Sequence, residues 1–482
     1  LMIILGTNSI KASGFDVDYS CRLDNPGDGA SSPDYLTRTP SGATNQKTFT
    51  ISYWVKRTGL QVGTSWQQVI GQQASNYFRC GFNSNEQGDI IRMYGNGGFE
   101  FRTTPFYRDV SAWYHVCLAI DTTQGTESNR AKLYVNGTQV TSFVTESYPS
   151  QNTDLDYNLD SEHVIGRSGS SGNDGLPAYL AQFVSIDGTA YAASDFGEFD
   201  EDSPTIWKPK DVSGLTFGSQ GFYLDFADAA DLGDDESGNT NDFAETGIAA
   251  INQVTDTPTN NFATLNPLDN TEGGIATFSE GNCKILTAVS AGNRCRSTVG
   301  LTTGKWYVEV KITSAAHLNY QTMGFTRTSP SGPGGDGWFG GGVGDVCYYS
   351  NDGKIYNTGN SVAGTAHGAT ATTGDIIGCF LDLDNNTANF YKNGAQQNSG
   401  TGYDISSING DTEEWFFACG DATSNANTAE LELNFGNPSY APSSAVSDAN
   451  GYGSFEYTPS VTTNGAAKDY LAICTKNLAE YG

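Results

Sequence analysis

Three carboxylates in the stretch "GEFDEDSP" have the clearest spacing for catalysis: Glu198, Asp200 and Asp202. Glycoside hydrolases place two carboxylates about 5–10 Å apart across a cleft, often on one strand as Glu-x-Asp-x-x-Glu. Here the final Glu is missing, and the stretch runs into Pro204 within a loop-like context. The pattern therefore favours a solvated acidic turn. We expect a protein without enzymatic activity, with polysaccharide depolymerase as the enzymatic alternative.

A second acidic group raises the question of a bound cation. Asp231, Asp234 and Asp235 lie close together in "DLGDDESGNTND", and Ca²⁺ prefers six to eight oxygen ligands of this kind. Neither this stretch nor "DLDNN" at 382–386 matches the EF-hand loop, since Thr387 stands at the glycine position of the latter. Ca²⁺ is thus a candidate cofactor, and these three aspartates are its candidate ligands.

Histidines and cysteines indicate little further chemistry. The histidines form no His-x-x-x-His pair and no nucleophile-elbow context, so metal hydrolysis and a catalytic triad lack support. Nine cysteines without a Cys-x-x-Cys pair argue against zinc and thioredoxin chemistry. They are typical of small core residues in a protein made in a reducing compartment. Whether Cys283 and Cys295 form a disulfide stays open. The four histidines are His115, His163, His317 and His367.

The glycine-rich stretch "GPGGDGWFGGGVGD" at 332–345 lacks the lysine and the strand-to-helix context of a phosphate loop. It contains Asp336, Trp338 and Phe339. Exposed aromatic rings of this kind stack on sugars or fill the pockets of a partner. The alternative is that the rings cover the edge of a sheet, and both interpretations stay open. Asp174, in the polar loop "SSGNDG", completes the candidate binding residues.

The composition of the chain excludes some classes of function. The 482 residues include 54 acidic and 25 basic ones, which gives a formal charge of −29. Such a negative field repels phosphate backbones, so we expect no binding to nucleic acid. The opening "LMIIL" is too short for a membrane span and no other apolar run approaches that length, so we expect no membrane insertion. Few charged residues and abundant Gly and aromatic residues predict an all-β protein.

Strand and turn signals recur in two places. "AKLYVNGTQV" and "TANFYKNGAQQ" each place Asn-Gly between two short strands, at Asn136-Gly137 and Asn393-Gly394. Asn-Gly is the strongest short hairpin signal because both central residues of a type I′ turn need positive φ. Each hairpin follows a further strand, so both halves carry a three-stranded meander. The surrounding residues do not align, which indicates two antiparallel sandwiches of similar design rather than copies.

Composition shifts then set the expected domain boundaries. Loop-forming Asp, Gly and Asn residues fill the region before 260, and the stretch after 440 lacks the apolar content to fold alone. We expect that last stretch to pack on a domain or a partner. The expected organisation is an N-terminal segment at 1–14, a β-sandwich at 15–247, a linker at 248–261, a second β-sandwich at 262–440 and a C-terminal tail at 441–482.

The second half resembles a SPRY domain. "GKWYVEVKI" at 304–312 is similar to its early strand, and "YYSNDGKIYNTGN" at 348–360 to its central hairpin. "GDIIGCFLDLDNNTANFYKNG" at 374–394 follows its most recognisable stretch, and "ELNFG" at 432–436 resembles its closing strand. The resemblance covers residues 262–440. It implies a β-sandwich that binds partners through loops at one end and has no catalytic residues.

The first half resembles a laminin-G or concanavalin-like jelly roll through "FTISYWVKR", "WYHVCLAID", "AKLYVNGTQV", "HVIGRS" and "AYLAQFVSIDG". Such domains commonly bind glycans or proteins, some through calcium. "GFYLDFADAADLGDDESGNTNDF", "NNFATLNPLD" and "YLAICTKNL" resemble structural and fibre proteins of tailed phages, marine ones especially. The joined resemblance implies a virion surface protein synthesised in the host cytoplasm. Its expected partners are other virion proteins and a host-surface glycan or receptor, and a homotrimer is the expected assembly. A purely architectural protein is the alternative.

Overall fold

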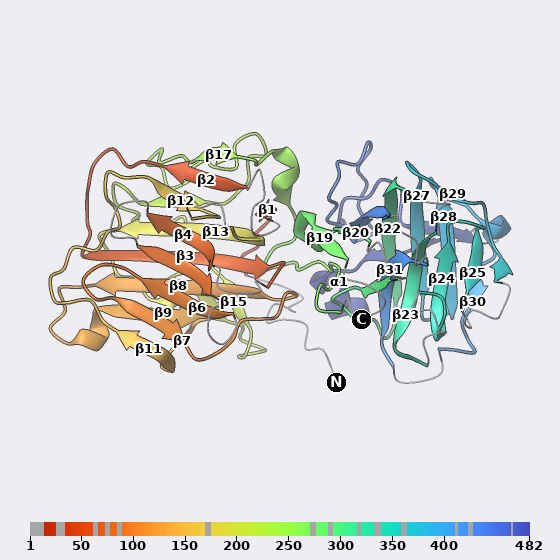
Figure 1. Ribbon diagram of the computed structural model, residues 1–482, viewed down its shortest axis with the longest axis horizontal. Helices are drawn as coiled ribbons and strands as arrows, with labels where there is room; N and C mark the ends of the chain where they lie inside the picture. Colours follow the sequence, from red (N-terminus) through yellow and green to blue (C-terminus); the bar gives the residue numbers. More distant parts are fainter. Residues whose placement is uncertain are drawn as a thin grey trace. The chain divides into compact units, whose positions relative to one another are not determined.

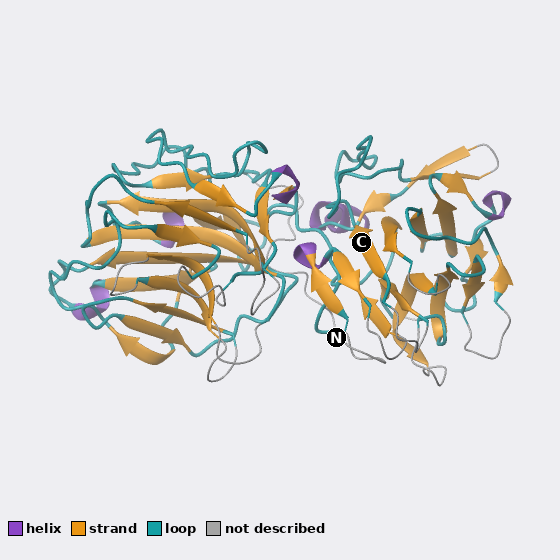
Figure 2. Ribbon diagram, turned by 45° about the horizontal axis from the view of Figure 1, so that its top comes forward, coloured by secondary structure: helices purple, strands orange, loops and turns teal. Residues whose placement is uncertain are grey.

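The computed structural model describes most of the chain, and those residues divide into two compact units. The first unit ends at Asn261 and the second begins at Phe262. Strands make up nearly all of the regular secondary structure in both units (Figure 2). The predicted all-β fold with tandem antiparallel sandwiches and a short C-terminal tail is confirmed. The described residues are 14–25, 34–60, 66–72, 78–83, 89–168, 175–269, 276–287, 293–315, 320–331, 339–357, 364–409, 413–422, 428–463 and 466–482.

Two antiparallel sheets form the first unit. One contains β1 (Ser20–Leu23), β3 (Thr48–Arg57), β8 (Trp113–Asp121), β9 (Ala131–Val135), β10 (Thr138–Gln139), β13 (Ala178–Asp187), β16 (Phe222–Leu224) and β18 (Gln253–Val254). The other contains β2 (Tyr35–Arg38), β4 (Trp66–Gln72), β5 (Arg79–Asn83), β6 (Ile90–Tyr94), β7 (Glu100–Thr103), β11 (Phe143–Ser147), β12 (His163–Ile165) and β17 (Ala244–Thr246). Their spatial orders are β10-β9-β8-β3-β13-β1-β18, with β16 on β13, and β11-β7-β6-β5-β4-β12-β2-β17 (Figure 1).

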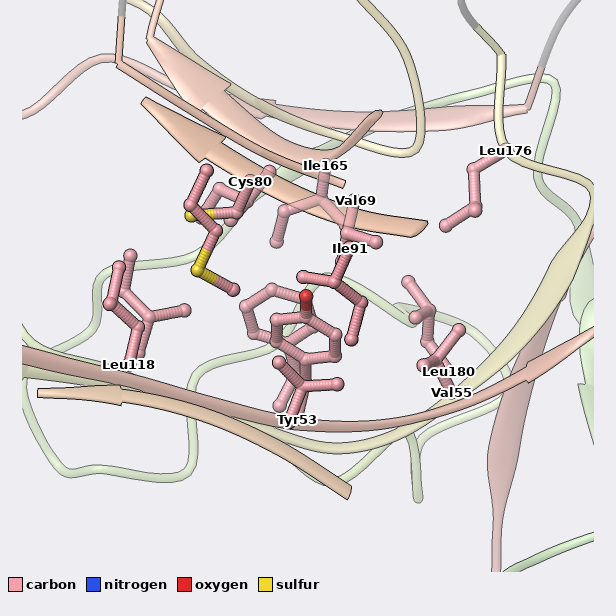
Figure 3. Packing of buried hydrophobic residues seen from close by; sticks show 14 of the residues in the cluster. Tyr53, Val55, Val69, Cys80, Ile91, Leu118, Ile165, Leu176 and Leu180 are labelled. Atoms are coloured by element: carbon pink, nitrogen blue, oxygen red, sulfur yellow. The ribbon is translucent and has the colours of Figure 1, made fainter. Parts of the chain in front are cut away.

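The core of the first unit lies between these sheets. Figure 3 shows Tyr53 and Leu118 on one sheet pointing toward Cys80 and Ile165 on the other. β3 is buried on its outer face as well, where Trp54 joins a second apolar cluster. A short hairpin of β14 (Gly197–Phe199) and β15 (Trp207–Pro209) contributes to that cover. Both faces of the central strand are therefore removed from water, including its polar positions.

A second sandwich makes up the other unit. Its larger sheet contains β19 (Thr277–Ser279), β20 (Lys284–Leu286), β22 (Lys305–Ser314), β27 (Ile376–Asp382), β28 (Thr387–Lys392), β29 (Ala395–Gln396), β30 (Tyr403–Asp404), β32 (Glu430–Asn434) and β35 (Leu471–Ala472). The smaller contains β21 (Asn293–Arg296), β23 (Gln321–Ser331), β24 (Val343–Tyr349), β25 (Lys354–Tyr356), β26 (Thr365–Ala366) and β31 (Trp415–Asp421). The paths are β19-β20-β32-β22-β27-β28-β29, with β30 on β28 and β35 on β22, and β21-β31-β23-β24-β25-β26.

Both predicted Asn-Gly hairpins are present. Asn136 and Gly137 have φ values of 47° and 74°, and Asn393 and Gly394 have 50° and 72°. Each pair joins two antiparallel strands, β9 to β10 and β28 to β29, as a type I′ turn requires. Each hairpin also continues a meander, from β8 in the first unit and from β27 in the second. The three-stranded meander predicted for both halves is confirmed.

The C-terminal residues after 440 cover the outer face of the larger sheet in the second unit. Phe455, Val461 and Tyr470 pack there against Tyr307 and Phe380. The segment contains β33 (Ser460–Thr463), β34 (Ala466–Asp469), β35 and the helix α1 (Thr475–Tyr481). β35 adds to the sheet in parallel beside β22. No helix in the described ranges is long and apolar enough to cross a membrane.

Residues 248–261, expected to be a linker, are integrated into the first unit. Ala250–Asn252 forms a short 3-10 helix, and β18 follows it directly and pairs with β1. The side chain of Asp256 is fully buried there. Abundant turn residues thus mark short local connections in this region rather than a free segment between domains.

Candidate functional site

The structure describes one of the four candidate binding residues, Phe339 in the glycine-rich loop. Asp174, Asp336 and Trp338 lie outside the described residues. Phe339 is completely buried and packs with Cys347 and Ala418, so the expectation of an exposed ring is wrong for this residue. The end of the loop is drawn against the sheet because Asp345 accepts hydrogen bonds from the backbone N–H groups of Gly340 and Gly342. Phe339 thus fits the alternative interpretation, in which the ring covers the edge of a sheet.

Of the carboxylates at 198–202, Glu198 lies on β14, and Asp200 and Asp202 lie in the turn that follows this strand. Asp200 accepts hydrogen bonds from the backbone N–H groups of Asp202 and Ser203. Lys208 on β15 lies 3.5 Å from Glu198 and 3.4 Å from Asp200. Burial raises the pKa of Asp200, but the hydrogen bonds from Ser203 and Lys208 outweigh it and hold the pKa below its usual range. A carboxyl with a lowered pKa is a poor general acid, so this group suits a structural role.

The acidic stretch at 231–242 organises its own loop. The Asp235 carboxylate accepts hydrogen bonds from the backbone N–H groups of Tyr223, Ser237 and Asn241. Asp231 accepts one from Gly233. Within the described ranges, which include Asp231, Asp234 and Asp235, no three His, Cys, Asp or Glu side chains are arranged to hold a metal ion. All nine cysteines are free and buried, so Cys283 and Cys295 form no disulfide.

His115 contacts a serine, but the pair does not have the environment of a catalytic base and its nucleophile. Its Nε2 lies 2.8 Å from Ser52 Oγ, and its Nδ1 accepts a hydrogen bond of 3.1 Å from the indole N–H of Trp207. Both His115 and Ser52 are buried. Burial lowers the pKa of His115 to about 3, so the ring is neutral at physiological pH. His115 is thus a buried packing residue whose two ring nitrogens both have hydrogen-bond partners.

A cleft on the second unit is the strongest candidate for a ligand site. Its volume is about 440 Å³, within the range of about 300–1,000 Å³ that is typical of small-molecule sites. One wall is the sheet face formed by β22, β27 and β28, and the other is the C-terminal segment. We call it the hairpin cleft because the turn glycine Gly394 lines it. Its lining residues are Tyr307, Gly378, Phe380, Tyr391, Gly394, Gln396, Tyr457, Thr458, Ser460 and Thr462.

Aromatic rings form the floor of the hairpin cleft. The ring centroids of Tyr307 and Phe380 lie 4.4 Å apart, and those of Phe380 and Tyr391 lie 4.7 Å apart. Register places these residues on the outer face of the sheet, since the neighbouring Trp306 and Cys379 point into the core. Gly378 leaves room for this floor, because a Cβ there would lie 3.0 Å from the Tyr307 ring. A half-buried ring, that of Tyr457, lies over Gly394.

Neutral polar groups complete the hairpin cleft. Gln396 donates a 2.8 Å hydrogen bond to the carbonyl of Thr462, and the Thr462 N–H donates one of 3.3 Å to the Tyr391 hydroxyl. Every lining side chain is uncharged at neutral pH, apart from the glycines that have none. Aromatic faces beside amide and hydroxyl groups suit a ligand with both apolar and hydroxylated surfaces.

One buried carboxylate holds the C-terminal wall in place. Glu309 on β22 is fully buried and accepts hydrogen bonds from the backbone N–H groups of Glu456, at 3.0 Å, and Tyr457, at 2.8 Å. It also accepts hydrogen bonds from Tyr307, Asn434 and Tyr440. Burial raises the pKa of Glu309, and the hydrogen bonds from Glu456 and Tyr457 oppose that rise. Glu309 thus positions the cleft wall without lining the cleft.

Sequence reasoning missed the hairpin cleft, although a signal was present. In "KWYVEVKI" the inward positions are Trp306, Val308 and Val310, yet Tyr307 on the opposite face is also apolar. Phe380 and Tyr391 occupy outward positions as well. Aromatic side chains on both faces of neighbouring strands require a second cover, and the C-terminal segment supplies it.

Comparison with known families matches each unit to one family. Residues 29–189 match the concanavalin A-like lectin/glucanases superfamily, and residues 305–437 match the SPRY domain. The chain therefore carries a concanavalin-like domain followed by a SPRY domain, and the predicted tandem is confirmed. These folds indicate that it binds a ligand, either a protein or a glycan. Association with a phage particle stays a prediction.

Curated relatives match parts of the chain. The ATP-dependent RNA helicase DDX1 of Xenopus laevis is 28% identical over 229 residues, which cover 45% of this chain and 28% of the helicase. Ran-binding protein 9 of Danio rerio is 33% identical over 105 residues, which cover 22% of this chain and 17% of that protein. This chain thus spans less than a third of either relative.

Two solved structures are similar to parts of the chain at low sequence identity. The SPRY domain of human HERC1 is 18% identical with a TM-score of 0.29, and the match covers 35% of this chain and 96% of that one. A putative carbohydrate binding protein from Bacteroides ovatus is 15% identical with a TM-score of 0.33, and the match covers 49% of this chain and 60% of that one.

Proposed function

We propose that this chain is a non-enzymatic virion surface protein of a tailed phage that binds a host-surface glycan. The hairpin cleft is the observation that carries the binding part of the proposal. Its aromatic floor offers apolar faces on which sugar rings stack, and Gln396, Ser460 and Thr462 offer hydrogen-bonding groups. The uncharged lining favours a neutral sugar over an anionic one, because the described lining residues include no cation to offset the desolvation of an anion.

Other observations support the virion part of the proposal. The joined sequence pattern of both halves resembles phage fibre proteins. Nine free, buried cysteines suit synthesis in a reducing host cytoplasm. A net charge of −29 favours a soluble protein and disfavours unspecific attraction to nucleic acid. A homotrimer would present three cleft copies, so weak affinities would add by avidity.

A purely architectural role is the second candidate. Both sandwiches would then contact only neighbouring virion proteins, and the hairpin cleft would receive a side chain of such a neighbour. A polysaccharide depolymerase is the third, and it would need Glu198 or Asp200 to act on substrate. The ion pairs of both carboxylates with Lys208 argue against that role.

Binding of the purified full chain to a bacterial-polysaccharide array tests the proposal. We expect binding to neutral glycans that Tyr457→Ala weakens at least tenfold. The backbone hydrogen bond of Tyr457 to Glu309 does not involve the side chain and is retained in that variant. Tyr481→Ala is the matched control, since Tyr481 is 42% exposed and does not line the cleft.

A calcium chelator and a reducing-end assay complete the experiment. Binding through the hairpin cleft should be indifferent to chelation, because the lining residues that the structure describes include no carboxylate. Loss of binding on chelation would move the site to another part of the chain. Absence of all glycan binding by a folded protein would favour the architectural role. Release of reducing ends, abolished in Glu198→Gln, would favour the depolymerase.

A further inference from the structure

A lysine, an aspartate and an asparagine meet in the interior of the first unit. Lys56 Nζ on β3 lies 2.7 Å from Asp256 Oδ2 and 2.7 Å from Asn261 Oδ1. Lys56 and Asp256 are fully buried, and Asn261 is 6% exposed. Asp256 and Asn261 belong to the segment that follows β18, some 200 residues along the chain. The fold thus brings an amine, a carboxylate and an amide into direct contact away from water.

Aromatic side chains enclose this group. Lys56 pairs across the sheet with Trp113 on one side and Tyr179 on the other. The indole N–H of Trp113 donates a 3.0 Å hydrogen bond to Asp256 Oδ1, and Nζ lies 5.6 Å from the Tyr179 ring centroid. Keeping two charges in such a setting is costly. Transfer of a proton from Nζ to the carboxylate removes both charges and leaves a nucleophilic amine.

The amide is held in a fixed orientation. Asn261 Nδ2 donates a 2.7 Å hydrogen bond to the carbonyl of Ser111, which leaves Oδ1 facing Lys56. The amine therefore sits beside the carbonyl group that it would attack, and such fixed proximity replaces a bimolecular encounter. Asp256 contacts the same Nζ and is placed to carry protons during the reaction.

We propose that Lys56 and Asn261 form an intramolecular isopeptide bond, with Asp256 as the catalytic proton carrier. Asp256 takes a proton from the ammonium, and Nζ then attacks Cγ of Asn261. The Nζ–Cγ bond forms, and the Cγ–Nδ2 bond breaks. The two protons that Nζ gives up pass through Asp256 to Nδ2, which leaves as ammonium. Asp256 ends as the carboxylate it was, and the step needs no oxidant or cofactor.

The bond would join β3 to the end of the first unit. Cross-linking two positions this far apart in sequence removes conformational freedom from the unfolded chain, as a long-loop disulfide does. It does so without a disulfide, in a chain whose nine cysteines are all free. Formation of this bond does not depend on a glycan ligand.

Intact-mass spectrometry of the denatured full chain is the test. We expect a mass one ammonia below that of the sequence, and a digest containing one peptide pair joined through Lys56 and Asn261. Lys56→Arg, Asp256→Asn and Asn261→Ala should each restore the full sequence mass. Lys305→Arg is the matched control, because Lys305 pairs with Asp384 at 2.9 Å on the surface, and it should keep the deficit.

Asn-Gly steps provide the competing explanation for a loss of ammonia, since they can form cyclic imides. An imide at any of the six Asn-Gly steps of the sequence would persist in Lys56→Arg and would give no joined peptides, and that result would overturn the proposal. A wild-type mass equal to that of the sequence would also overturn it and leave a buried ion pair. The wild-type measurement decides the matter even where a variant fails to fold.

Discussion

The two Asn-Gly hairpins have the same turn conformation, but different aromatic side chains lie over them. We call the aromatic ring over each turn glycine its cover. In each, the Asn side-chain oxygen and backbone N–H both bond to the strand on the far side of the meander. Asn136 bonds in this way to His115, and Asn393 to Ile376. In each, an aromatic ring from a later segment lies over the glycine. A Cβ on Gly137 would lie 2.2 Å from the Trp207 ring, and one on Gly394 would lie 2.6 Å from the Tyr457 ring.

What differs is how firmly the covering ring is held. Trp207 is 3% exposed, hydrogen-bonded through its indole to His115 and packed in an apolar cluster. Tyr457 is half-buried, and its described hydrogen bond runs from its backbone to Glu309. The first cover closes its hairpin, whereas the second leaves the hairpin cleft beside it. The turn is thus alike in both hairpins. How firmly the covering ring is held determines whether the surface beside the turn is closed core or an open cleft.

Truncation of the two rings should separate these roles most strongly. We expect Trp207→Ala to reduce the free energy of unfolding of the first unit by about 3–5 kcal/mol, the usual cost of removing a buried large aromatic side chain. Tyr457→Ala should cost about 1 kcal/mol, because its ring is partly in water, while it removes binding. Urea unfolding of both variants measures the difference. Equal losses of stability would contradict the distinction between a sealed and an open cover.

Glu309→Gln tests how the second cover is attached. The side-chain NH2 group of Gln would face N–H groups whose hydrogen bonds the carboxylate now accepts. A buried N–H of Glu456 or Tyr457 would then be unpaired. We expect a loss of about 3 kcal/mol and faster proteolysis after residue 440. Glu430→Gln is the control, since Glu430 forms a part-exposed pair with Lys284 and should cost about 0.5 kcal/mol. Unchanged proteolysis in Glu309→Gln would show that apolar packing alone holds the segment.

Acidification should weaken the first cover through His115. Burial lowers the pKa of His115 to about 3 from 6.5, so between these values the unfolded chain binds a proton that the folded one does not. Stability therefore falls as the pH drops below 6.5, by about 2 kcal/mol at pH 5 for one such histidine. His115→Gln should remove this contribution from the pH dependence of unfolding. The same slope in the variant would mean that other groups cause it.

Local signals were sufficient to predict part of the molecule. Asn136-Gly137 and Asn393-Gly394 form type I′ hairpins because the requirement for positive φ lies in the two residues themselves. The order of quoted motifs likewise indicated a SPRY domain over the second half. Phe339 shows the limit of local reasoning, since its glycine-rich neighbours indicated exposure while Asp345 holds that end of the loop against the sheet.

Contacts between distant segments were beyond sequence reasoning. Lys56 reads as the polar position of an alternating strand, yet its partners Asp256 and Asn261 are 200 and 205 residues away. The hairpin cleft likewise requires the C-terminal segment to lie across the sheet, and nothing local to Tyr457 indicates that Gly394 is its neighbour. Such juxtapositions follow from the tertiary fold, and contacts between residues this far apart leave no pattern in the local sequence.

Substitution of each turn glycine by alanine tests the comparison through the smallest expected difference in stability. Both positions have positive φ, so each substitution costs about 1 kcal/mol in backbone strain. Gly137→Ala also drives a methyl group into the fixed Trp207 ring, whereas Tyr457 has space to move away from Gly394→Ala. We therefore expect Gly137→Ala to cost about 1 kcal/mol more, by overpacking. Combining Gly137→Ala with Trp207→Ala should abolish that excess, and its persistence in the double variant would place the strain in the turn itself.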